Sequence, residues 1–332
     1  MLITKRYWVV YKMNVSDFYR TEGLKADDVE IVVTLPTFKR PEQVLLTLKS
    51  LASQTIDKVF AVIVMDNHDD ADGAAASAKF MRENALQGLV IIAHDRGNCH
   101  AYNAGWAKAL SEFPNFRWLA VIDDDEIADE NWLHNHLNTL QDTKCDIVGG
   151  PQLQQFHKNA ADVWKRHPVF EPHYKVTGAV PILYSSGNVV ITRGVLDKMP
   201  QPFLEPQFNF IGGGDSDFYK RCQIQGFTFA WCNEAPVLED VPERRSTFRW
   251  VNARSYRNGA ISAIIETRAS KNRTKTILKS CLLLAASPFR SLKSAIKHKS
   301  LIIGLYHMQI AFGRLLAEFG IVNEQYRNPE AN

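Results

Sequence analysis

Residues 120–126 read AVIDDDE, a short apolar run that ends in three consecutive carboxylates, Asp123, Asp124 and Asp125. Three adjacent acids repel one another and cannot all enter a hydrophobic core without a compensating charge. At the end of a buried strand they would meet solvent at the edge of a sheet, where a hard divalent cation can bind carboxylates. A solvated acidic turn is the alternative, so the rest of the chain must decide between the two.

Two further apolar runs of strand length precede this one. Residues 31–35 (IVVTL) and 59–67 (VFAVIVMDN) flank residues 41–51, which begin with a proline and carry apolar residues at helical spacing. Strand, helix and strand in this order predict a βαβ unit, in which ligands bind at the carboxyl ends of the strands. The polar residues expected at this mouth are Thr37, Arg40, Asp66 and Asn67.

A third unit repeats the arrangement. Residues 88–94 (GLVIIAH) predict a strand, residues 95–105 (DRGNCHAYNAG) a glycine- and asparagine-rich turn, and residues 106–110 (WAKAL) the start of a helix. Residues 116–125 (FRWLAVIDDD) predict the next strand, so that the triple Asp reaches the same sheet edge as Asp66.

The middle of the chain is less regular. Residues 145–154 (CDIVGGPQLQ) predict a strand and a turn, and VVITR at 189–193 predicts another strand of the sheet. Residues 156–184 lack periodicity and are rich in aromatic residues, His and Pro. They are either a segment that contacts substrate or an irregular connection, since loops over such sheets often carry function.

A second carboxylate cluster follows at residues 212–221, GGGDSDFYKR. Three glycines permit tight backbone geometry immediately before Asp215 and Asp217, and Phe218 and Cys222 predict a helix with one apolar face. Capping of that helix by Asp215 is the structural alternative to a chemical role.

Taken in order, these segments resemble the family 2 glycosyltransferases with the GT-A fold, and among them the bacterial exopolysaccharide (succinoglycan-type) enzymes. The resemblance implies an α/β fold with a Rossmann-like, mostly parallel central sheet flanked by helices. It implies a GT-A domain at residues 30–255, preceded by an N-terminal extension at 1–29. The remaining residues, 256–332, are expected to form a helical region that associates with a membrane surface, because of their composition. The matching blocks are VVTLPTFKRP, VIVMDN, RGNCHAYNAG, VIDDDE, SSGNVVITR and GGGDSDFYKR.

The resemblance also implies roles on the donor side of the site. Asp66 looks like the acid that recognises the uracil base of a UDP-sugar. Thr37, Arg40 and Asn67 belong to the matching nucleotide-binding segments. Asp123–Asp125 resemble the DxD motif, in which Asp125 would bind Mg²⁺ or Mn²⁺ on the diphosphate and Asp123 would contact the ribose, the sugar or the metal.

Asp215 aligns with the general base of the family, although Gly214 stands where the family commonly has an acid. Glu239 lies near the position of a downstream metal-binding His and would be a substitute ligand, with an ordinary solvated acid as the alternative. RRSTFRW at 244–250 faintly resembles the QxxRW element of processive synthases. Residues there that would neutralise diphosphate or stack on a sugar, unless they form an exposed basic turn, are Arg244, Arg245, Arg249 and Trp250.

The reaction implied by the resemblance is the inverting transfer of a hexose from a UDP-sugar to a growing, lipid-linked surface polysaccharide or oligosaccharide. A cation would neutralise the leaving diphosphate, and a carboxylate would remove the proton of the acceptor hydroxyl. Two alternatives remain open: a sugar-phosphate nucleotidyltransferase, which shares a nucleotide-binding α/β sheet, and a basic nucleic-acid-binding protein. No recognisable nucleic-acid module is present, so nucleic acid is not the expected partner.

The C-terminal part of the chain has a different composition. Between Thr267 and Ala317 there are ten Lys or Arg residues and no Asp or Glu, although the net charge of all 332 residues is only +3. Pro288 is expected to divide two helical pieces, and the charge-poor stretch at 301–313 is too short to span a bilayer. This pattern predicts an amphipathic attachment to an anionic membrane surface.

The cysteines and the N-terminus indicate the compartment. Five cysteines without paired spacing favour reduced thiols, and residues 1–18 mix charges with aromatic residues, unlike a signal peptide. We therefore expect a cytoplasmic protein that is peripheral on the inner face of the cytoplasmic membrane.

Overall fold

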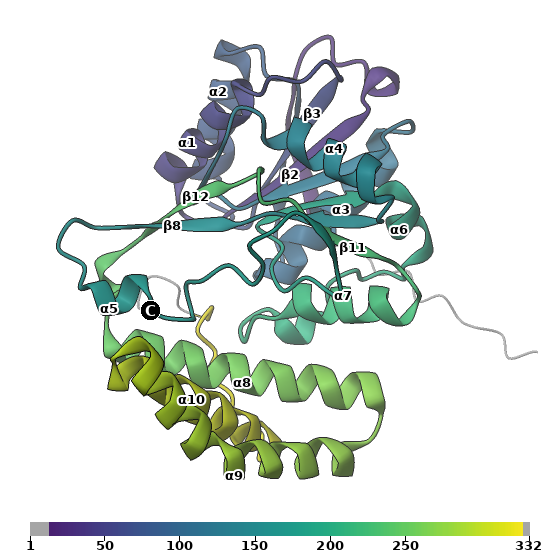
Figure 1. The fold of residues 1–332 in the computed structure, drawn as a ribbon. Helices are drawn as coiled ribbons and strands as arrows, with labels where there is room; N and C mark the ends of the chain where they lie inside the picture. Colours follow the sequence, from purple (N-terminus) through teal and green to yellow (C-terminus); the bar gives the residue numbers. More distant parts are fainter. Residues whose placement is uncertain (1–12, 328–332) are drawn as a thin grey trace, which may run out of the picture.

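A nine-stranded mixed sheet forms the centre of the molecule in the computed structural model, which describes residues 13–327 (Figure 1). Strands β4, β3, β2 and β5 are parallel, whereas β10 is antiparallel to both β5 and β7. The predicted α/β fold with central parallel strands is confirmed. In spatial order the strands are β1 (Val15–Arg20), β4 (Gly88–Ala93), β3 (Phe60–Asp66), β2 (Ile31–Thr37), β5 (Trp118–Ile122), β10 (Asn188–Thr192), β7 (Ile147–Gly149), β11 (Phe229–Trp231) and β9 (Gly178–Val180).

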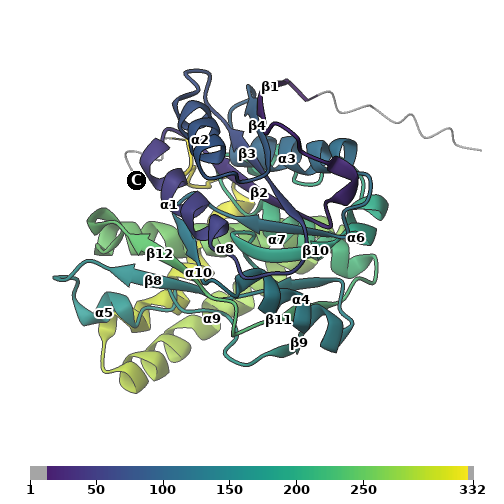
Figure 2. The same ribbon diagram turned by 90° about the horizontal axis from the view of Figure 1, so that it is seen from above.

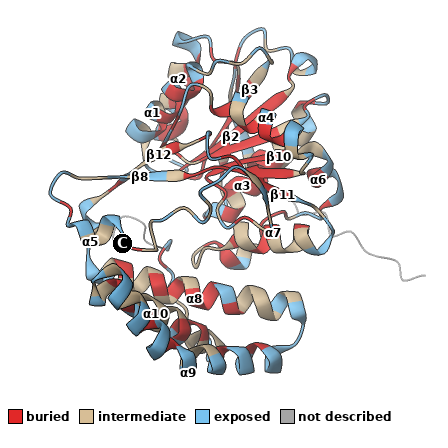
Figure 3. Cartoon of the chain, in the orientation of Figure 1, coloured by how far each residue is buried: buried red, intermediate tan, exposed pale blue. Residues whose placement is uncertain are grey.

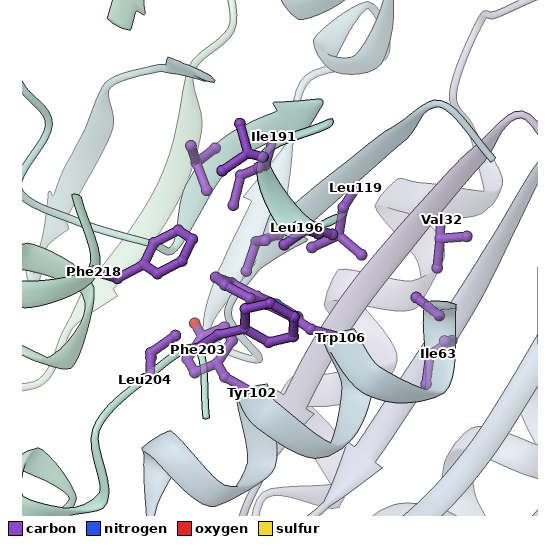
Figure 4. Close-up of a cluster of buried hydrophobic side chains, with 14 of the residues drawn as sticks. Val32, Ile63, Tyr102, Trp106, Leu119, Ile191, Leu196, Phe203, Leu204 and Phe218 are labelled. Carbon is purple, nitrogen blue, oxygen red and sulfur yellow. The ribbon is translucent and has the colours of Figure 1, made fainter. Parts of the chain in front are cut away.

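Helices cover both faces of this sheet because alternate residues of each buried strand point to opposite sides. Ile31 and Val33 of β2 pack with Leu48, whereas Val32 belongs to the cluster that contains Trp106 and Phe218 (Figure 4). On the side of Leu48 lie α1 (Pro41–Ala52), α2 (Asp72–Glu83) and α4 (Trp132–Thr143). On the side of Trp106 lie α3 (Asn98–Glu112), α6 (Arg193–Lys198) and α7 (Gly214–Ile224).

Helix α3 begins earlier than its sequence suggests. Residues 98–105 were expected in a turn, but they form the first two turns of the helix. Gly105 permits this, because a Cβ there would lie 2.5 Å from Sδ of Met65, so only glycine lets α3 approach β3 so closely. Asn103 exchanges two hydrogen bonds with the backbone of Leu204, and tertiary contacts thus outweigh the local turn preference.

A small three-stranded sheet follows the triple Asp. Strand β12 (Val237–Val241) pairs antiparallel with β6 (Glu126–Ala128) and parallel with β8 (Gln152–Phe156). This pairing sets Glu239 opposite both Glu126 and Gln154. Segments more than 100 residues apart in the chain therefore meet beside the carboxylates. The segment 156–184 is mostly irregular, apart from the short helix α5 (Asp162–Lys165) and β9.

Three long helices form a C-terminal unit below the sheet in Figure 1: α8 (Phe248–Ser270), α9 (Arg273–His298) and α10 (Leu301–Glu318). The expected boundary between residues 255 and 256 falls inside α8. Pro288 was expected to separate two helices, but it lies within the continuous helix α9. Proline cannot donate to the carbonyl of Leu284, yet the hydroxyl of Ser287 donates to that oxygen at 2.8 Å and replaces the missing bond.

The buried residues of helix α9 are small and polar, whereas many of its exposed residues are large and apolar. Figure 3 shows that much of this helix is exposed. Its buried residues are Thr276, Ser280, Ser287 and Ser291. Its exposed apolar residues, which recur along one helix face, include Leu278, Leu282, Phe289, Leu292 and Ile296. Among residues 13–327, no helix is long and apolar enough to cross a bilayer.

The N-terminal extension contributes one edge of the sheet. Strand β1 pairs antiparallel with β4 at the rim of the molecule (Figure 2). The expected extension at residues 1–29 is thus partly an edge strand, and its first twelve residues lie outside the described part of the chain.

Candidate functional site

A cavity of about 1160 Å³ opens at the carboxyl ends of β2, β3 and β5. Parallel strands deliver their following loops to the same edge, so residues separated by 80 positions meet there. The wall opposite these loops comes from the 168–174 segment, from the loop at 208–216 and from α8. Most of the site residues expected from the sequence line this cavity: Thr37, Arg40, Asn67, Asp123, Asp125, Asp215 and Glu239.

Asp124, the central acid of the three, joins two loops. It is buried, and its carboxylate accepts hydrogen bonds from Thr37 Oγ1 at 2.8 Å and from Arg40 Nη1 at 2.9 Å. Burial raises the pKa of Asp124 to about 6, although the charge of Arg40 opposes this change. Asp124 therefore connects the loop after β2 to the loop after β5, and the sequence had suggested no role for it.

Asp125 and Glu239 both lie beside Arg245, and Asp125 also contacts Arg40. Arg40 Nη1 lies 2.9 Å from Oδ2 of Asp125, and Arg245 Nη1 donates to Oε1 of Glu239 at 2.8 Å. Arg245 also approaches Asp125, with 3.9 Å between Nη2 and Oδ2. Burial and the charge of Asp125 raise the pKa of Glu239. Glu239 is therefore part of the carboxylate cluster and not a solvated surface acid.

Asp123 is held by two neighbouring side chains. The hydroxyl of Tyr102 donates a short hydrogen bond to its carboxylate, and its backbone N–H donates to Glu126 at 2.9 Å. Glu126 is fully buried and also accepts from the side chain of Gln152. Burial, followed by the charge of Asp125, raises the pKa of Asp123 to about 7. The crowding of acids on this wall of the cavity therefore favours the protonated form of Asp123.

No three His, Cys, Asp or Glu side chains within residues 13–327 converge on one point as a complete set of metal ligands. Mg²⁺ and Mn²⁺ do not need such a set when they bind a nucleotide, because one or two carboxylates suffice when phosphate and water oxygens complete the shell. Asp125 suits this role, since it lines the cavity and its side chain retains 22% exposure. The carboxylates here fit a cation that arrives with a diphosphate.

Asp66 and Asn67 terminate β3 in different ways. Asp66 is buried, does not line the cavity, and accepts hydrogen bonds from the backbone N–H groups of His68 at 3.2 Å and Ala74 at 2.8 Å. Asn67 donates to two backbone carbonyls and accepts from the N–H of Gly97 at 2.7 Å. Asp66 thus fixes the start of α2, whereas Asn67 ties the end of β3 to the end of β4 and reaches the cavity wall.

Asp215 is the second residue of α7 and not its N-cap. Its carboxylate accepts from the N–H of Ser216 at 2.7 Å, so part of its bonding is of the helix-terminal kind. Burial raises the pKa of Asp215, while this hydrogen bond and the charges of Arg257 and Arg254 oppose the rise. Asp215 thus stands at the cavity wall as a buried carboxylate whose pKa lies above the ordinary value.

Asp217, two residues further on, has a structural partnership instead. It is 2% exposed and accepts hydrogen bonds from Arg221 at 2.8 Å and Arg268 at 3.0 Å. These contacts connect α7 to α8. The two acids of the same motif therefore have different partners: Asp217 is bound by two arginines, and within the described chain Asp215 is not.

Aromatic residues line the side of the cavity formed by the irregular segment. Phe170 stacks on Trp250, with 5.6 Å between ring centroids and 10° between planes. Arg245 and Trp250 line the cavity, whereas Arg249 is exposed and does not. The segment 156–184 thus contributes directly to the cavity wall through residues 168–174 and 182–184.

Several residues in or beside the cavity were not identified from the sequence. Tyr102 and Glu126 lie within or next to the recognised motifs, so their positions offered a signal. Arg254 and Arg257 lie within α8, outside the recognised motifs, and offered none. Tyr326 offered none because the chain returns to the cavity only after α8, α9 and α10. The backbone N–H of Tyr326 donates to the carbonyl of Phe210 at 3.0 Å, which fixes the returning segment beside the glycine loop.

The chain matches the family model described as "Glycosyl transferase family 2" over residues 32–199, about half of its length. It is 28% identical over 238 residues to the succinoglycan biosynthesis protein ExoM of Rhizobium meliloti, covering 70% of this chain and 74% of that protein. It is also 24% identical over 208 residues to the glycosyltransferase AglE of Haloferax volcanii, covering 61% and 64% of the two chains.

Solved structures share the fold at low sequence identity. The mannosyltransferase PcManGT from Pyrobaculum calidifontis, in complex with GDP-Man and Mn²⁺, superposes with a TM-score of 0.57 at 14% identity, over 93% of this chain and 91% of that one. Residues 1–349 of S. aureus TarS in complex with UDP give a TM-score of 0.51 at 12% identity, over 91% and 92%. The family match decides among the three protein classes left open by the sequence: the chain belongs to glycosyl transferase family 2 and is a glycosyltransferase.

Proposed function

We propose that the protein transfers a hexose from a UDP-sugar, with inversion, to a growing lipid-linked surface glycan. The observation that carries the proposal is that carboxylates from two separate parts of the chain line the same cavity. The Asp123–Asp125 cluster stands at the strand ends, and Asp215 stands at the start of α7. A leaving diphosphate and an acceptor hydroxyl need these two kinds of carboxylate, one for a cation and one for a proton.

The donor is a nucleotide sugar that binds at the loops after β2, β3 and β5. Thr37, Arg40 and Asn67 line this part of the cavity, and Asp66 orders the start of α2 behind it. The complex of TarS with UDP supports uridine as the base. The complex of PcManGT with GDP-Man makes a guanosine donor the comparison that any assay must include.

A divalent cation, Mg²⁺ or Mn²⁺, would be held by Asp125, with Asp123 and Glu239 as further ligands. When bound, it would neutralise charge on the leaving diphosphate. Arg40 and Arg245 already place positive charge on Asp125 and Glu239. These two guanidinium groups offset the repulsion between the carboxylates in the free enzyme, and they would turn toward phosphate oxygens once a cation compensates the acids.

Asp215 would accept the proton of the acceptor hydroxyl as that oxygen attacks the anomeric carbon. The bond from the new oxygen forms while the bond to the diphosphate breaks, and the proton moves to the carboxylate. A single displacement of this kind inverts the anomeric centre. The hydrogen bond from Ser216 holds the carboxylate in place during the transfer.

A glycan acceptor would lie along the aromatic side of the cavity. Phe170 and Trp250 offer flat apolar faces of the type on which sugar rings stack. The name of the relative ExoM, a succinoglycan biosynthesis protein, supports a surface polysaccharide as the product.

An anionic membrane surface would bind the outward face of α9. Five large apolar residues of this helix are more than half exposed, which a water-facing helix would not favour. Exposed basic residues border them, and α9 contains no acid. Apolar residues flanked by positive charge match an anionic lipid interface. The residues concerned are Leu278, Leu282, Phe289, Leu292 and Ile296, with Lys275, Arg290, Lys293 and Lys297 beside them.

The test is release of the nucleotide diphosphate from a panel of UDP- and GDP-sugars with Mg²⁺, with Mn²⁺ or with a chelator. We expect UDP from one UDP-hexose, little GDP, and loss of turnover after chelation. Release of pyrophosphate would indicate nucleotidyl transfer and contradict the proposal. Full turnover under stringent chelation would contradict the metal role of Asp125.

A further inference from the structure

Two arginines of α8 stand in the cavity without an acidic partner. Arg254 and Arg257 are three residues apart on one face of the helix, and both line the cavity. Among residues 13–327, neither has a carboxylate within ion-pair distance. Arg254 Nη1 donates to the hydroxyl of Tyr326 at 3.1 Å, and Arg257 Nη1 donates to Gln325 Oε1 at 3.0 Å.

This pairing is unlike that of the other inward-facing arginines. Arg40 binds Asp124 and Asp125, Arg221 binds Asp217, and Arg314 binds Glu266 at 2.7 Å. Arg257 is 5% exposed, and its Nε has no hydrogen-bond partner in the described chain. A buried donor without a partner costs free energy, so its persistence here indicates a group that a ligand completes.

The positive charge of Arg254 changes the pKa values of the two groups beside it, Arg257 and Tyr326. Burial, followed by the nearby charge of Arg254, lowers the pKa of Arg257 to about 10. The charge of Arg254 lowers the pKa of the Tyr326 phenol to about 7, against the effect of burial. Both shifts have the sign expected beside a positive charge. In return, the charge of Tyr326 raises the pKa of Arg254 against the effect of burial, so the phenol is the group that answers this charge in the absence of a ligand.

The surrounding loop leaves room for these guanidinium groups. Gly212 has a φ of +75°, and a Cβ there would lie 2.7 Å from Nη2 of Arg257. A side chain at this position would both strain the backbone and displace the arginine. The first glycine of the motif therefore maintains the position of Arg257 beside Asp215.

Arg254 and Arg257 belong to a different part of the cavity from the arginines of the donor side. The donor-side guanidinium groups, Arg40 and Arg245, are occupied by the acids after β5 and β12. Arg254 and Arg257 belong to the helical unit that carries the outward apolar face of α9. Their charges also act on Asp215, so an anion bound to them would lie near the reacting hydroxyl of the acceptor.

We propose that Arg254 and Arg257 form a phosphate-binding subsite for the acceptor, and that the acceptor carries a phosphate or diphosphate close to its reacting sugar. Two guanidinium groups provide forked donors that match phosphate oxygens. The phosphate would take the place of the Tyr326 hydroxyl and reach the free Nε of Arg257. This inference rests on the proposed function and specifies its acceptor class.

The test measures transfer to two matched acceptors, an alkyl glycosyl phosphate and the alkyl glycoside that lacks the phosphate. Enzymes are the wild type, Arg254→Gln, Arg257→Gln and Arg257→Lys, with Arg249→Gln as the control because Arg249 is exposed on the same helix and outside the cavity. We expect the Gln variants to raise KM for the phosphate-bearing acceptor by about tenfold to a hundredfold. KM for the neutral acceptor, KM for the donor and the UDP dissociation constant should remain unchanged, and Arg257→Lys should recover part of the loss.

Weaker UDP binding in the Gln variants would instead assign the pair to the donor diphosphate, and an equal loss with both acceptors would make it structural. Either result overturns the inference. Binding of inorganic pyrophosphate in the presence of a chelator, measured by calorimetry, provides a readout without turnover: we expect binding to the wild type and none to Arg254→Gln. If the wild type transfers sugar but ignores the acceptor phosphate, only this inference fails. If it transfers no sugar from any donor, the proposed function fails.

Discussion

Nη1 of Arg40 lies 2.9 Å from Oδ2 of Asp125 and equally far from Oδ1 of Asp124, so one guanidinium group holds two acids of the triple Asp. This contact explains how consecutive carboxylates remain at a buried strand end in the absence of a cation. Arg40, in the loop after β2, therefore stabilises the loop after β5.

Replacing Arg40 by Gln should therefore destabilise the protein. Asp124 would be left buried with only Thr37 as a partner, and the expected loss is about 1–3 kcal/mol in the free energy of unfolding. Urea unfolding measures it. The matched control is Arg20→Gln, which removes an exposed ion pair to Glu112 and should cost about 0–1 kcal/mol. Equal losses of unfolding free energy in the two variants would show that Arg40 stabilises the protein no more than an exposed ion pair does.

Replacing Tyr326 by Phe should remove an ionisation near pH 7. The pKa of this phenol is about 7 in the folded protein because Arg254 lies beside it, with Arg257 and Arg245 adding positive charge. Ultraviolet difference spectra of the wild type should show one phenol titrating near neutral pH, and the variant should lack that step. A wild type without such a step would contradict the electropositive character of this wall.

The same shift affects stability in a defined direction. The folded pKa lies below the unfolded value of about 10, so ionisation stabilises the folded state. The contribution is absent below about pH 7, grows as the pH rises above it, and is complete above about pH 10. The difference in unfolding free energy between the wild type and Tyr326→Phe should therefore increase with pH across this window.

Replacing Ser287 by Ala should destabilise α9, because the carbonyl of Leu284 would then lose its hydrogen bond next to Pro288. The Ser287 hydroxyl bonds the carbonyl of Leu284 that Pro288 cannot reach, and its loss should cost about 1 kcal/mol. In a Pro288→Ala background the new N–H supplies that bond, so the same Ser287→Ala change should cost much less. A double-mutant cycle in urea measures the coupling. Additive losses would contradict the compensation described for this helix.

Replacing both Leu278 and Leu282 by Gln should weaken binding to anionic lipid vesicles. Each leucine is more than 60% exposed on the outer face of α9, and each should contribute about 1–2 kcal/mol when it enters the interface. Cosedimentation with vesicles of anionic or zwitterionic lipid measures the effect. Leu46→Gln is the control, because this leucine is 52% exposed on α1. A wild type that ignores anionic vesicles, or that dimerises through this face, would contradict the membrane proposal.

Much of the sheet was predictable because its buried strands have an unambiguous pattern. β2 and β3 are continuous apolar runs followed by polar residues, and no helix of that length would be so uniformly apolar in a domain of this size. The start of α3 was predicted wrongly, since the Gly and Asn residues that resemble a turn are there for close packing. Gly105 against Met65 is a tertiary contact that local sequence does not encode.

Part of the candidate site was predictable for the same reason. Residues at strand ends, such as Thr37 and Asp125, follow from the sheet, because its geometry brings their loops together. Tyr326 does not, since it reaches Phe210 only through the packing of three intervening helices. For Glu239 the sequence left two interpretations open, a metal ligand and a solvated surface acid. The register of β12 on β6, which sets Glu239 opposite Glu126, is what places it beside Asp125.

The most direct test of the account is the rate of sugar transfer by Asp215→Asn, measured in a single turnover with saturating donor and acceptor. Asparagine keeps the size of the side chain and its place at the start of α7 but cannot accept the proton. We predict a fall in the transfer rate of about 10²–10⁴ with an unchanged dissociation constant for UDP. Asp217→Asn, which breaks the ion pairs to Arg221 and Arg268, should instead lower stability and largely retain the rate. Transfer by Asp215→Asn at the wild-type rate would show that another group takes the proton.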